Sequence, residues 1–454
     1  MKRMLLIVFF YTGQLFVNAQ TASMRQVISG PVLGQVELRT ATVWIEVSTQ
    51  VKTVELKYWK TIEPGKTAVK PFSGSLQNEF NPVRIDIGGL DMNTTYQYEF
   101  LLNGKPSDAK GSFSTKDLWQ WRKPAPDFSF LTGSCAYFNE AIYDRPGKSY
   151  GGDSTIFETM AKTPAAFMVW LGDNWYTREA DYMSEWGLWY RASHDRSLKV
   201  LQPFWKSMPQ YAIWDDHDYG PDDSDGTYYL KDASRKLFMS YWCNPSYGEN
   251  GKGIYTKVSY SDADIFLTDD RYFRSSDDLL DSMDGKPNPD KHFFGRNQLD
   301  WLENALVNSL ATFKIIAVGS QVLNPIHDNF ECLQHYSWEY QALMRFIAEQ
   351  KIEGVIFLSG DRHHSEVVKA ERANHYTLYD ITSSPFTSGV AKVRGIEINS
   401  PFRIPNTLVE AQNFSRINIT GKKGERLLNV EFIGTKGNKL AEWSVSEKQL
   451  KEPG

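Results

Sequence analysis

The chain has 454 residues, and 41% of them are hydrophobic, 14% aromatic and 23% charged. These values exclude a disordered or low-complexity protein, and the length exceeds what one hydrophobic core usually supports, so we expect two domains. The formal net charge of -5 argues against a nucleic-acid partner.

The first 19 residues have the pattern of a secretory signal peptide. Lys2 and Arg3 precede an apolar run over 4–10, and Val17-Asn18-Ala19 offers small residues for cleavage. We therefore expect a secreted or periplasmic protein cleaved near Ala19. A buried first strand and an uncleaved anchor are the alternatives, but the run is shorter than a spanning helix needs. Because no later segment has about 18 uninterrupted apolar residues, we expect no membrane span.

The chain has only three cysteines, whereas the disulfide framework of an exported domain normally uses a larger, even number. Whether Cys243 and Cys332 form a disulfide or stay free is left open by the sequence. Cys135 follows a predicted strand and lies in a context that suggests chemistry.

Residues 20–116 show short alternating segments, such as 42–47 and 54–59, separated by polar or Gly/Pro turns. This pattern predicts an all-β sandwich of fibronectin or immunoglobulin type. Tyr96 is placed like a tyrosine corner, in which the hydroxyl bonds back onto the preceding turn, although an ordinary amphipathic strand is the alternative. Residues 117–127, which include Pro124 and Pro126, break the pattern and predict a linker.

From residue 128 to 448, predicted strands alternate with predicted helices, which indicates an α/β domain. The stretches 219–253 and 274–294 are long and rich in Asp, Gly and Ser, so we expect loops that line a site. Strands are predicted at 128–131, 166–171, 211–214, 258–268, 313–318, 354–358, 376–381, 415–420, 427–433 and 440–445. Helices are predicted at 155–161, 182–198, 298–308 and 338–349.

Four of these strands end in polar clusters. Carboxyl ends of strands in an open α/β sheet converge on one edge, where ligands usually bind. Carboxylates, imidazoles, a thiol and a phenol gathered there would be desolvated at high cost unless cations compensated their charges. Singly, each cluster would be read as a turn, a structural histidine or a buried thiol, but together they predict a metal centre. The clusters are Gly133-Ser134-Cys135, Gly172-Asp173-Asn174-Trp175-Tyr176, Asp215-Asp216-His217-Asp218 and Ser359-Gly360-Asp361-Arg362-His363-His364.

These clusters resemble the motifs of the calcineurin-like metallophosphoesterases, and in detail those of the alkaline phosphatase D (PhoD-like) family. The resemblance covers nearly all of the chain after residue 19, because family members also carry an amino-terminal β-sandwich. For residues 128–448 it implies a four-layer αββα sandwich. The similar runs are Phe130-Leu131-Thr132-Gly133-Ser134-Cys135, Leu171-Gly172-Asp173-Asn174-Trp175-Tyr176, Trp214-Asp215-Asp216-His217-Asp218, Thr268-Asp269-Asp270-Arg271 and Ser359-Gly360-Asp361-Arg362-His363.

The resemblance also implies a set of metal ligands. Cys135 and Tyr176 would bind a ferric ion, and Asp173 would bridge it to a second cation. Asp361 and His363 fall on the two ligand positions of the last motif. Family members are associated with iron plus calcium, so the resemblance implies Fe³⁺ with one or two Ca²⁺ ions.

The remaining site residues follow from the same resemblance. Asp216 falls on the position of a ligand asparagine, where its oxygens suit a hard cation such as calcium. His217 falls on the histidine that contacts the phosphoryl group or the leaving oxygen, a role that suits an imidazole because it titrates near neutral pH. An ion pair with Asp269 or Asp270 is as good an interpretation of Arg271 as a contact with substrate. Weaker candidates for substrate binding are Asn174, Arg271 and Gln321.

The function implied is that of a secreted phosphoric ester hydrolase, an alkaline phosphatase or phosphodiesterase that uses a metal-bound hydroxide as the nucleophile. Its substrate would be a small-molecule or polymeric phosphate ester. The alternatives are a metal-assisted hydrolase of sulfate esters or nucleotides, and an inactive extracellular binding protein. The natural substrate, the preference for diesters or monoesters, and the oligomeric state stay open.

Overall fold

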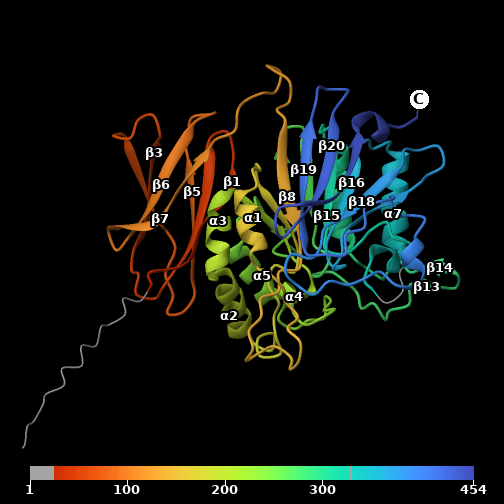
Figure 1. The fold of residues 1–454 in the computed structure, drawn as a ribbon, viewed down its shortest axis with the longest axis horizontal. Coiled ribbons are helices and arrows are strands. Elements are labelled where there is room, and N and C mark those ends of the chain that lie inside the picture. The colour runs from red at the N-terminus through yellow and green to blue at the C-terminus, as the bar shows by residue number, and fades with distance from the viewer. Residues whose placement is uncertain (1–24, 327–329, 454) are drawn as a thin grey trace, which may run out of the picture.

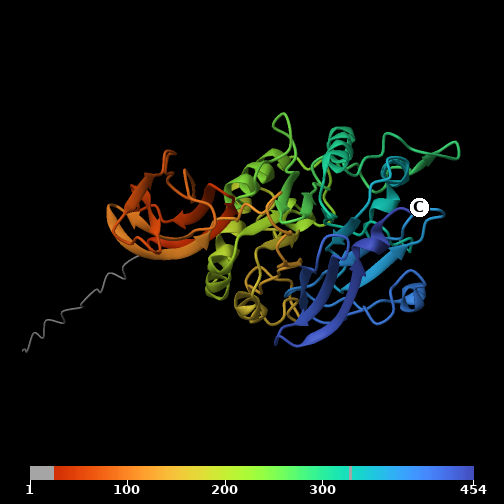
Figure 2. The ribbon, with the colours of Figure 1, turned by 90° about the horizontal axis from the view of Figure 1, so that it is seen from above.

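The computed structural model describes residues 25–326 and 330–453. The predicted signal peptide lies outside the described residues. Within them, no helix combines the length and the apolar character that crossing a membrane requires. Figure 2 shows the strands of the amino-terminal part at one end of an elongated molecule, with the remainder of the chain extending away from them.

Strands β1 to β7 form two antiparallel sheets, with the orders β1-β2-β5 and β4-β3-β6-β7. Their side chains alternate between the interior and solvent, as in β5, where Val83, Ile85 and Ile87 are buried and their neighbours are more exposed. One hydrophobic core joins the two sheets. The strands are β1 (Val27–Val36), β2 (Thr40–Val47), β3 (Val54–Lys60), β4 (Thr67–Pro71), β5 (Asn81–Gly88), β6 (Thr95–Leu102) and β7 (Lys105–Ser114).

Tyr96, at the start of β6, makes the contact that the sequence predicted. Its ring is buried, and its hydroxyl accepts a hydrogen bond from the backbone N–H of Asp91 at 2.9 Å. The phenol thereby ties the turn before β6 to the core. The tyrosine-corner interpretation is confirmed at this contact.

We expect Tyr96→Phe to lower the free energy of unfolding by about 0.5 to 1.5 kcal/mol, because the Asp91 amide loses its partner. Urea denaturation measures this change. Tyr58→Phe is the matched control, since Tyr58 lies on the neighbouring strand and its hydroxyl makes no hydrogen bond among the described residues. Equal stability of the two variants would contradict the role given to Tyr96.

Most of the strands from β8 onward belong to two six-stranded sheets that share one buried core. The first has the order β10-β9-β8-β19-β20-β21 and the second β11-β12-β15-β16-β18-β17. The first sheet is built from β8 (Phe128–Gly133), β9 (Met168–Leu171), β10 (Gln210–Ile213), β19 (Asn413–Thr420), β20 (Leu427–Gly434) and β21 (Lys439–Ser446). The second is built from β11 (Thr256–Tyr260), β12 (Ala263–Leu267), β15 (Phe313–Val318), β16 (Val355–Ser359), β17 (Glu366–Ala370) and β18 (Leu378–Thr382).

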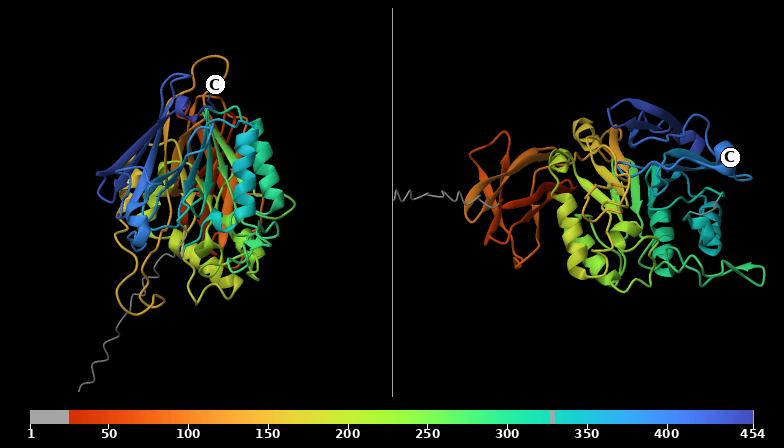
Figure 3. Two further views of the ribbon diagram at one scale, coloured as in Figure 1. Left: turned by 90° about the vertical axis from the view of Figure 1, so that its right-hand side faces the viewer. Right: turned by 60° about the horizontal axis from the view of Figure 1, so that its bottom comes forward.

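Helices cover these sheets, so the mixed α/β class is confirmed. Helices α1, α2, α3 and α5 contribute to a core that also contains Trp170 of β9 and Ala212 of β10. Helices α6 and α7 contribute to the core of the second sheet, and Figure 3 shows them on the side opposite β19 to β21. The helices are α1 (Ile156–Lys162), α2 (Glu185–Arg196), α3 (Gln202–Ser207), α4 (Asp216–Tyr219), α5 (Lys231–Tyr241), α6 (Arg296–Asn308) and α7 (Ser337–Glu349).

The amino-terminal sheets are fixed against these helices by a buried arginine. Arg196, at the end of α2, lies with its guanidinium carbon 4.9 Å from the ring centre of Trp44 on β2. The same carbon is 4.4 Å from the rings of Trp205 and Trp242. Trp44 also donates from its indole N–H to the carbonyl of Ser240 at 2.8 Å. The two parts of the chain therefore pack closely (Figure 1).

Several details differ from the sequence predictions. The segment predicted as one strand at 258–268 is the hairpin β11–β12, which turns at Ser261 with a φ of 51°. The predicted loop 219–253 contains α5, whose buried face includes Leu237 and Phe238. The predicted loop 274–294 contains a short hairpin, β13 (Ser282–Met283) and β14 (Lys286–Pro287), and β17 was not predicted.

All three cysteines are buried and free. Cys243 packs in the core beneath the first sheet, whereas Cys332 forms an isolated parallel bridge with Gln321. The disulfide that the sequence left open is therefore not formed.

Candidate metal centre

The four polar clusters meet at one end of the two large sheets. Strands β8, β9 and β10 are parallel neighbours, so the residues that follow them emerge at the same edge. The fourth cluster follows β16, which belongs to the second sheet. The clusters therefore converge as predicted, but from two sheets and not from one.

Two glycines allow the cluster loops to approach each other. A Cβ atom on Gly172 would lie 2.5 Å from the Cβ of Asp215, and one on Gly360 would lie 2.7 Å from the carbonyl oxygen of Leu171. Any larger residue would push the loops apart. The Gly-Asp pairs of the sequence thus serve close packing between clusters.

Four residues at this edge have left-handed backbone conformations. The φ angles are 64° for Cys135, 52° for Asp173, 62° for Asp361 and 55° for His363. Such conformations cost on the order of 1–3 kcal/mol each in a residue with a side chain, and they gather at functional sites. The fold therefore directs these four side chains toward the site, and their backbone conformations lower the stability of the protein.

One group of candidate ligands is formed by Cys135, Asp173 and His363, whose donor atoms all lie within 4.8 Å of one another. Tyr176 joins this group, because its hydroxyl donates to Oδ2 of Asp173 at 2.7 Å. That hydroxyl also lies 3.2 Å from Nε2 of His363. A sulfur, a phenol, a carboxylate and an imidazole nitrogen thus face one point.

A second group is formed by Asp173, Asp216 and His217, again with donor atoms within 4.8 Å. Asp216 forms a third group with Asp222 and Asp223, and its Oδ2 accepts the backbone N–H of Asp223 at 2.8 Å. Asp173 is the residue shared by the first two groups. It therefore occupies the position from which one carboxylate could contact two cations.

Tyr150 is a site residue that sequence reasoning missed. Its hydroxyl lies 3.0 Å from Nδ1 of His363, while Nε2 of the same ring faces Tyr176. This contact directs Nε2, rather than Nδ1, toward the ligand group. Because Tyr150 lies in an irregular segment 213 residues from His363 in sequence, no local pattern could have revealed the contact.

Burial makes the ligand group hard to ionise by itself. Burial, helped by the charge of Asp173, raises the pKa of the Cys135 thiol and of the Tyr176 phenol well above their usual values. Burial and the charge of Asp216 raise the pKa of Asp173 well above its usual range and that of Asp361 to about 6.

The pKa values of Asp216 and His363 are lowered instead. Although burial opposes ionisation of Asp216, His217, Arg271 and the Asp223 amide hold its pKa at about 2. Burial lowers the pKa of His363 to about 4. At neutral pH Asp216 is therefore a carboxylate, and His363 is a neutral imidazole with a lone pair for a metal.

The donor set fits a metal ion. Oδ1 of Asp173 is buried and has no hydrogen-bond partner in the part of the chain that the structure describes. Such an atom costs free energy unless a cation or water contacts it. Thiolate, phenolate and imidazole suit a transition metal, and carboxylate oxygens suit a hard cation.

The ligand groups open into a cavity of about 610 Å³. Cys135 and Tyr176 lie beneath it, since their exposed fractions are 0% and 3%. Arg362, Lys392 and Arg394 bring positive charge to its wall, and sequence reasoning had not assigned them a role. The predicted site residues on its lining are Asp173, Asp216, His217, Asp361 and His363.

The three weaker candidates for substrate contact lie outside this lining. Arg271 is fully buried and forms ion pairs with Asp215 and Glu331, not with the side chains of Asp269 or Asp270. Asn174 donates to the carbonyl of Ile213 at 2.8 Å. Gln321 is also fully buried and donates to Glu366 and Thr382 at 2.9 and 2.8 Å. Their contacts support the loops around the site.

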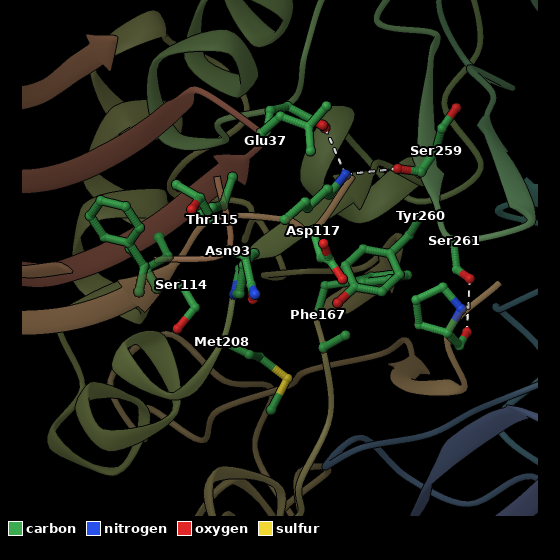
Figure 4. A pocket seen from close by; sticks show the side chains of 18 of the residues that line it. Glu37, Asn93, Ser114, Thr115, Asp117, Phe167, Met208, Ser259, Tyr260 and Ser261 are labelled. Carbon is green, nitrogen blue, oxygen red and sulfur yellow. Dashed lines mark hydrogen bonds and ion pairs between the residues drawn. The ribbon is translucent and has the colours of Figure 1, made fainter. Parts of the chain in front are cut away.

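A further cavity of about 610 Å³ lies between the amino-terminal sheets and the rest of the chain. Lys116 borders it and donates to Glu37 at 2.7 Å and to the carbonyl of Ser259 at 2.8 Å (Figure 4). None of the candidate metal ligands lines it. The chemistry therefore belongs to the cavity at the strand ends.

Comparisons with known proteins show which proteins this chain is similar to. The family model described as PhoD-like phosphatase matches residues 130–416. Alkaline phosphatase D of Bacillus subtilis (strain 168) is 24% identical over 354 residues, which cover 67% of this chain and 56% of that protein. The chain thus spans about half the length of this curated relative. A solved structure of PhoD is similar with a TM-score of 0.75 and 17% identity, over 93% of this chain and 90% of that one.

Proposed function

Because the chain belongs to the PhoD-like phosphatase family, we propose that it is a metal-dependent phosphoesterase whose site is the cavity at the strand ends. The observation that carries this proposal is Asp173, which is shared by two ligand groups and whose buried Oδ1 has no hydrogen-bond partner among the described residues. Hydrolysis of bis(p-nitrophenyl) phosphate, measured with and without a chelator, tests it. Unchanged turnover after removal of the metals would contradict it.

Two cations are proposed. Cys135, Tyr176, Asp173 and His363 would hold Fe³⁺, because a thiolate and a phenolate suit a trivalent transition metal. Asp173, Asp216 and Asp361 would hold Ca²⁺ on the other side of the shared carboxylate. Bound cations would lower the pKa of a water and offset negative charge on the phosphoryl oxygens.

The side chains have separate roles in this proposal. Asp216 stays ionised, since its pKa is about 2, and supplies fixed negative charge to its ligand group. Nε2 of His217 lies 3.3 Å from Oδ1 of Asp222, which orients the imidazole at the cavity. His217 would then stabilise the developing charge or donate a proton to the leaving oxygen.

We expect Tyr150→Phe to weaken iron binding by about 10- to 100-fold, because His363 loses the partner that orients its ring. Competition with a chelator of known affinity measures the change in the purified protein. Tyr229→Phe is the matched control, since Tyr229 is exposed and its hydroxyl donates to the carbonyl of Met183. Equal iron affinity of the two variants would show that Tyr150 does not position the ligand.

We also propose the finer assignments of architecture and location. The packing of helices α1, α3 and α5 on one sheet and α6 and α7 on the other supports a four-layer αββα sandwich for 128–448. The two small sheets support a fibronectin-like domain over 20–116, with 117–127 as the linker. The charged and apolar pattern of residues 1–19 supports export. A phosphate ester, small or polymeric, would be the substrate.

A further inference from the structure

We propose that Lys392 and Arg394 form a second anion-binding subsite, which accepts a negatively charged group on an organic substituent of the phosphate ester. The subsite would favour esters that carry a second phosphate or carboxylate over esters whose substituents are neutral. This inference rests on the proposed function, because it assigns the substrate class of the same cavity.

The segment that carries Lys392 and Arg394 is tied to the metal centre. The backbone N–H of Ala391 donates to the carbonyl of His363 at 3.0 Å. After Lys392 and Arg394 in the chain, the carboxylate of Glu397 accepts a hydrogen bond from Arg362 at 2.8 Å. Lys392 and Arg394 lie between these two attachments and line the same cavity as the candidate ligands. They are therefore held beside the site, although they lie outside the predicted motifs.

The other arginines near the site already have acidic partners. Arg271 is engaged by Asp215 and Glu331, and Arg362 by Glu397. In contrast, the side chains of Lys392 and Arg394 make no hydrogen bond or ion pair within residues 25–326 and 330–453. These two positively charged side chains are consequently available to a ligand.

The size and chemistry of the cavity favour a group other than the scissile phosphate. The proposed cations and His217 would hold the scissile group at the ligand end. A volume of about 610 Å³ is in the range of cavities that accept whole organic ligands, so a substituent fits beside the phosphoryl group. Lysine and arginine at the wall would bind a second anion by charge-assisted hydrogen bonds. The carboxylates on the rest of the lining would repel an acidic substituent, so such a substituent is expected at Lys392 and Arg394.

The test compares two chromogenic substrates that differ by one phosphate. They are thymidine 5′-(p-nitrophenyl phosphate) and thymidine 3′-phosphate 5′-(p-nitrophenyl phosphate). For the metal-loaded wild type we expect kcat/KM to be about tenfold higher for the bisphosphate, as expected for one additional charge-assisted contact. In the Lys392→Ala/Arg394→Ala protein, the ratio of the two values should fall close to one.

Two further variants separate the subsite from general effects of charge. Lys392→Arg/Arg394→Lys should keep most of the preference, because both positive charges remain. Lys422→Ala/Lys423→Ala removes two exposed lysines from the turn between β19 and β20 and should leave the ratio unchanged. A wild-type ratio near one, or a ratio that survives in the double alanine variant, would overturn the proposal.

Failure of the proposed function is recognised separately. If the metal-loaded wild type hydrolyses neither substrate, phosphoesterase activity is contradicted, and calorimetry then decides the subsite. Thymidine 3′,5′-bisphosphate should bind about tenfold more tightly than thymidine 5′-phosphate in the wild type, and equally in the double alanine variant. Equal binding of the two nucleotides by the wild type would overturn the subsite on its own.

Discussion

We expect the Asp216→Asn protein to hydrolyse bis(p-nitrophenyl) phosphate at least about a hundredfold more slowly than the wild type, a change of about 3 kcal/mol in the barrier. Asn keeps the size of the side chain and can still accept the backbone N–H of Asp223. It lacks the negative charge that the low pKa of Asp216 maintains at neutral pH. The loss therefore reports the charge that the ligand group supplies to a cation.

The control for this variant is Asp284→Asn. Asp284 is exposed in the turn between β13 and β14, and its φ of 51° is one that Asn also adopts readily. It should retain wild-type turnover. If Asp216→Asn does so as well, and a chelator has no effect on either protein, the metal-dependent account is wrong.

The second large effect is expected on the colour of the iron-loaded protein. Free tyrosine has a pKa of about 10, and burial raises the pKa of Tyr176 further, so only a strongly charged cation would hold a phenolate there. A phenolate and the Cys135 thiolate would both donate charge to ferric iron and produce visible absorption. Tyr176→Phe and Cys135→Ser should each shift or bleach that absorption.

Matched variants distinguish this effect from loss of folding. Cys243→Ser changes a buried cysteine in a different part of the core and should keep the spectrum, as should Tyr229→Phe. Iron-loaded protein whose spectrum is the same in Tyr176→Phe, Cys135→Ser and the wild type would remove both residues from the ligand set. The assignment of Asp216 to the other cation would be unaffected.

The sequence predicts the strand ends of this fold well, because each is marked locally. A buried strand gives an apolar run, and the Gly-Asp pairs that follow β9 and β16 are needed where loops touch, as Gly172 and Gly360 show. It misses α5, whose boundaries have weak signals: Leu230 precedes the helix and offers no side-chain cap. It also joins β11 and β12, because the turn at Ser261 contains neither Gly nor Pro.

The site itself is predicted only in part. Cys135, Asp173 and His363 stand in motifs, and the structure brings their donor atoms together. Tyr150 acts across a long sequence separation, and a long-range contact has no local signature. Arg271 shows the reverse case, since this charged residue stands in a motif but forms ion pairs with Asp215 and Glu331 inside the protein. The partners of a charged side chain depend on packing that local patterns do not specify.

The most direct test of the account is metal reconstitution of Asp173→Asn beside the wild type. Both proteins are stripped with a chelator, iron and calcium are added back stepwise, and bound metal and turnover of bis(p-nitrophenyl) phosphate are measured together. Because Asp173 is shared by two ligand groups, the wild type should regain turnover as both metals bind, and the variant should regain little of either. A stripped wild type that hydrolyses the ester at its full rate, or an Asp173→Asn protein that recovers fully, would contradict the account.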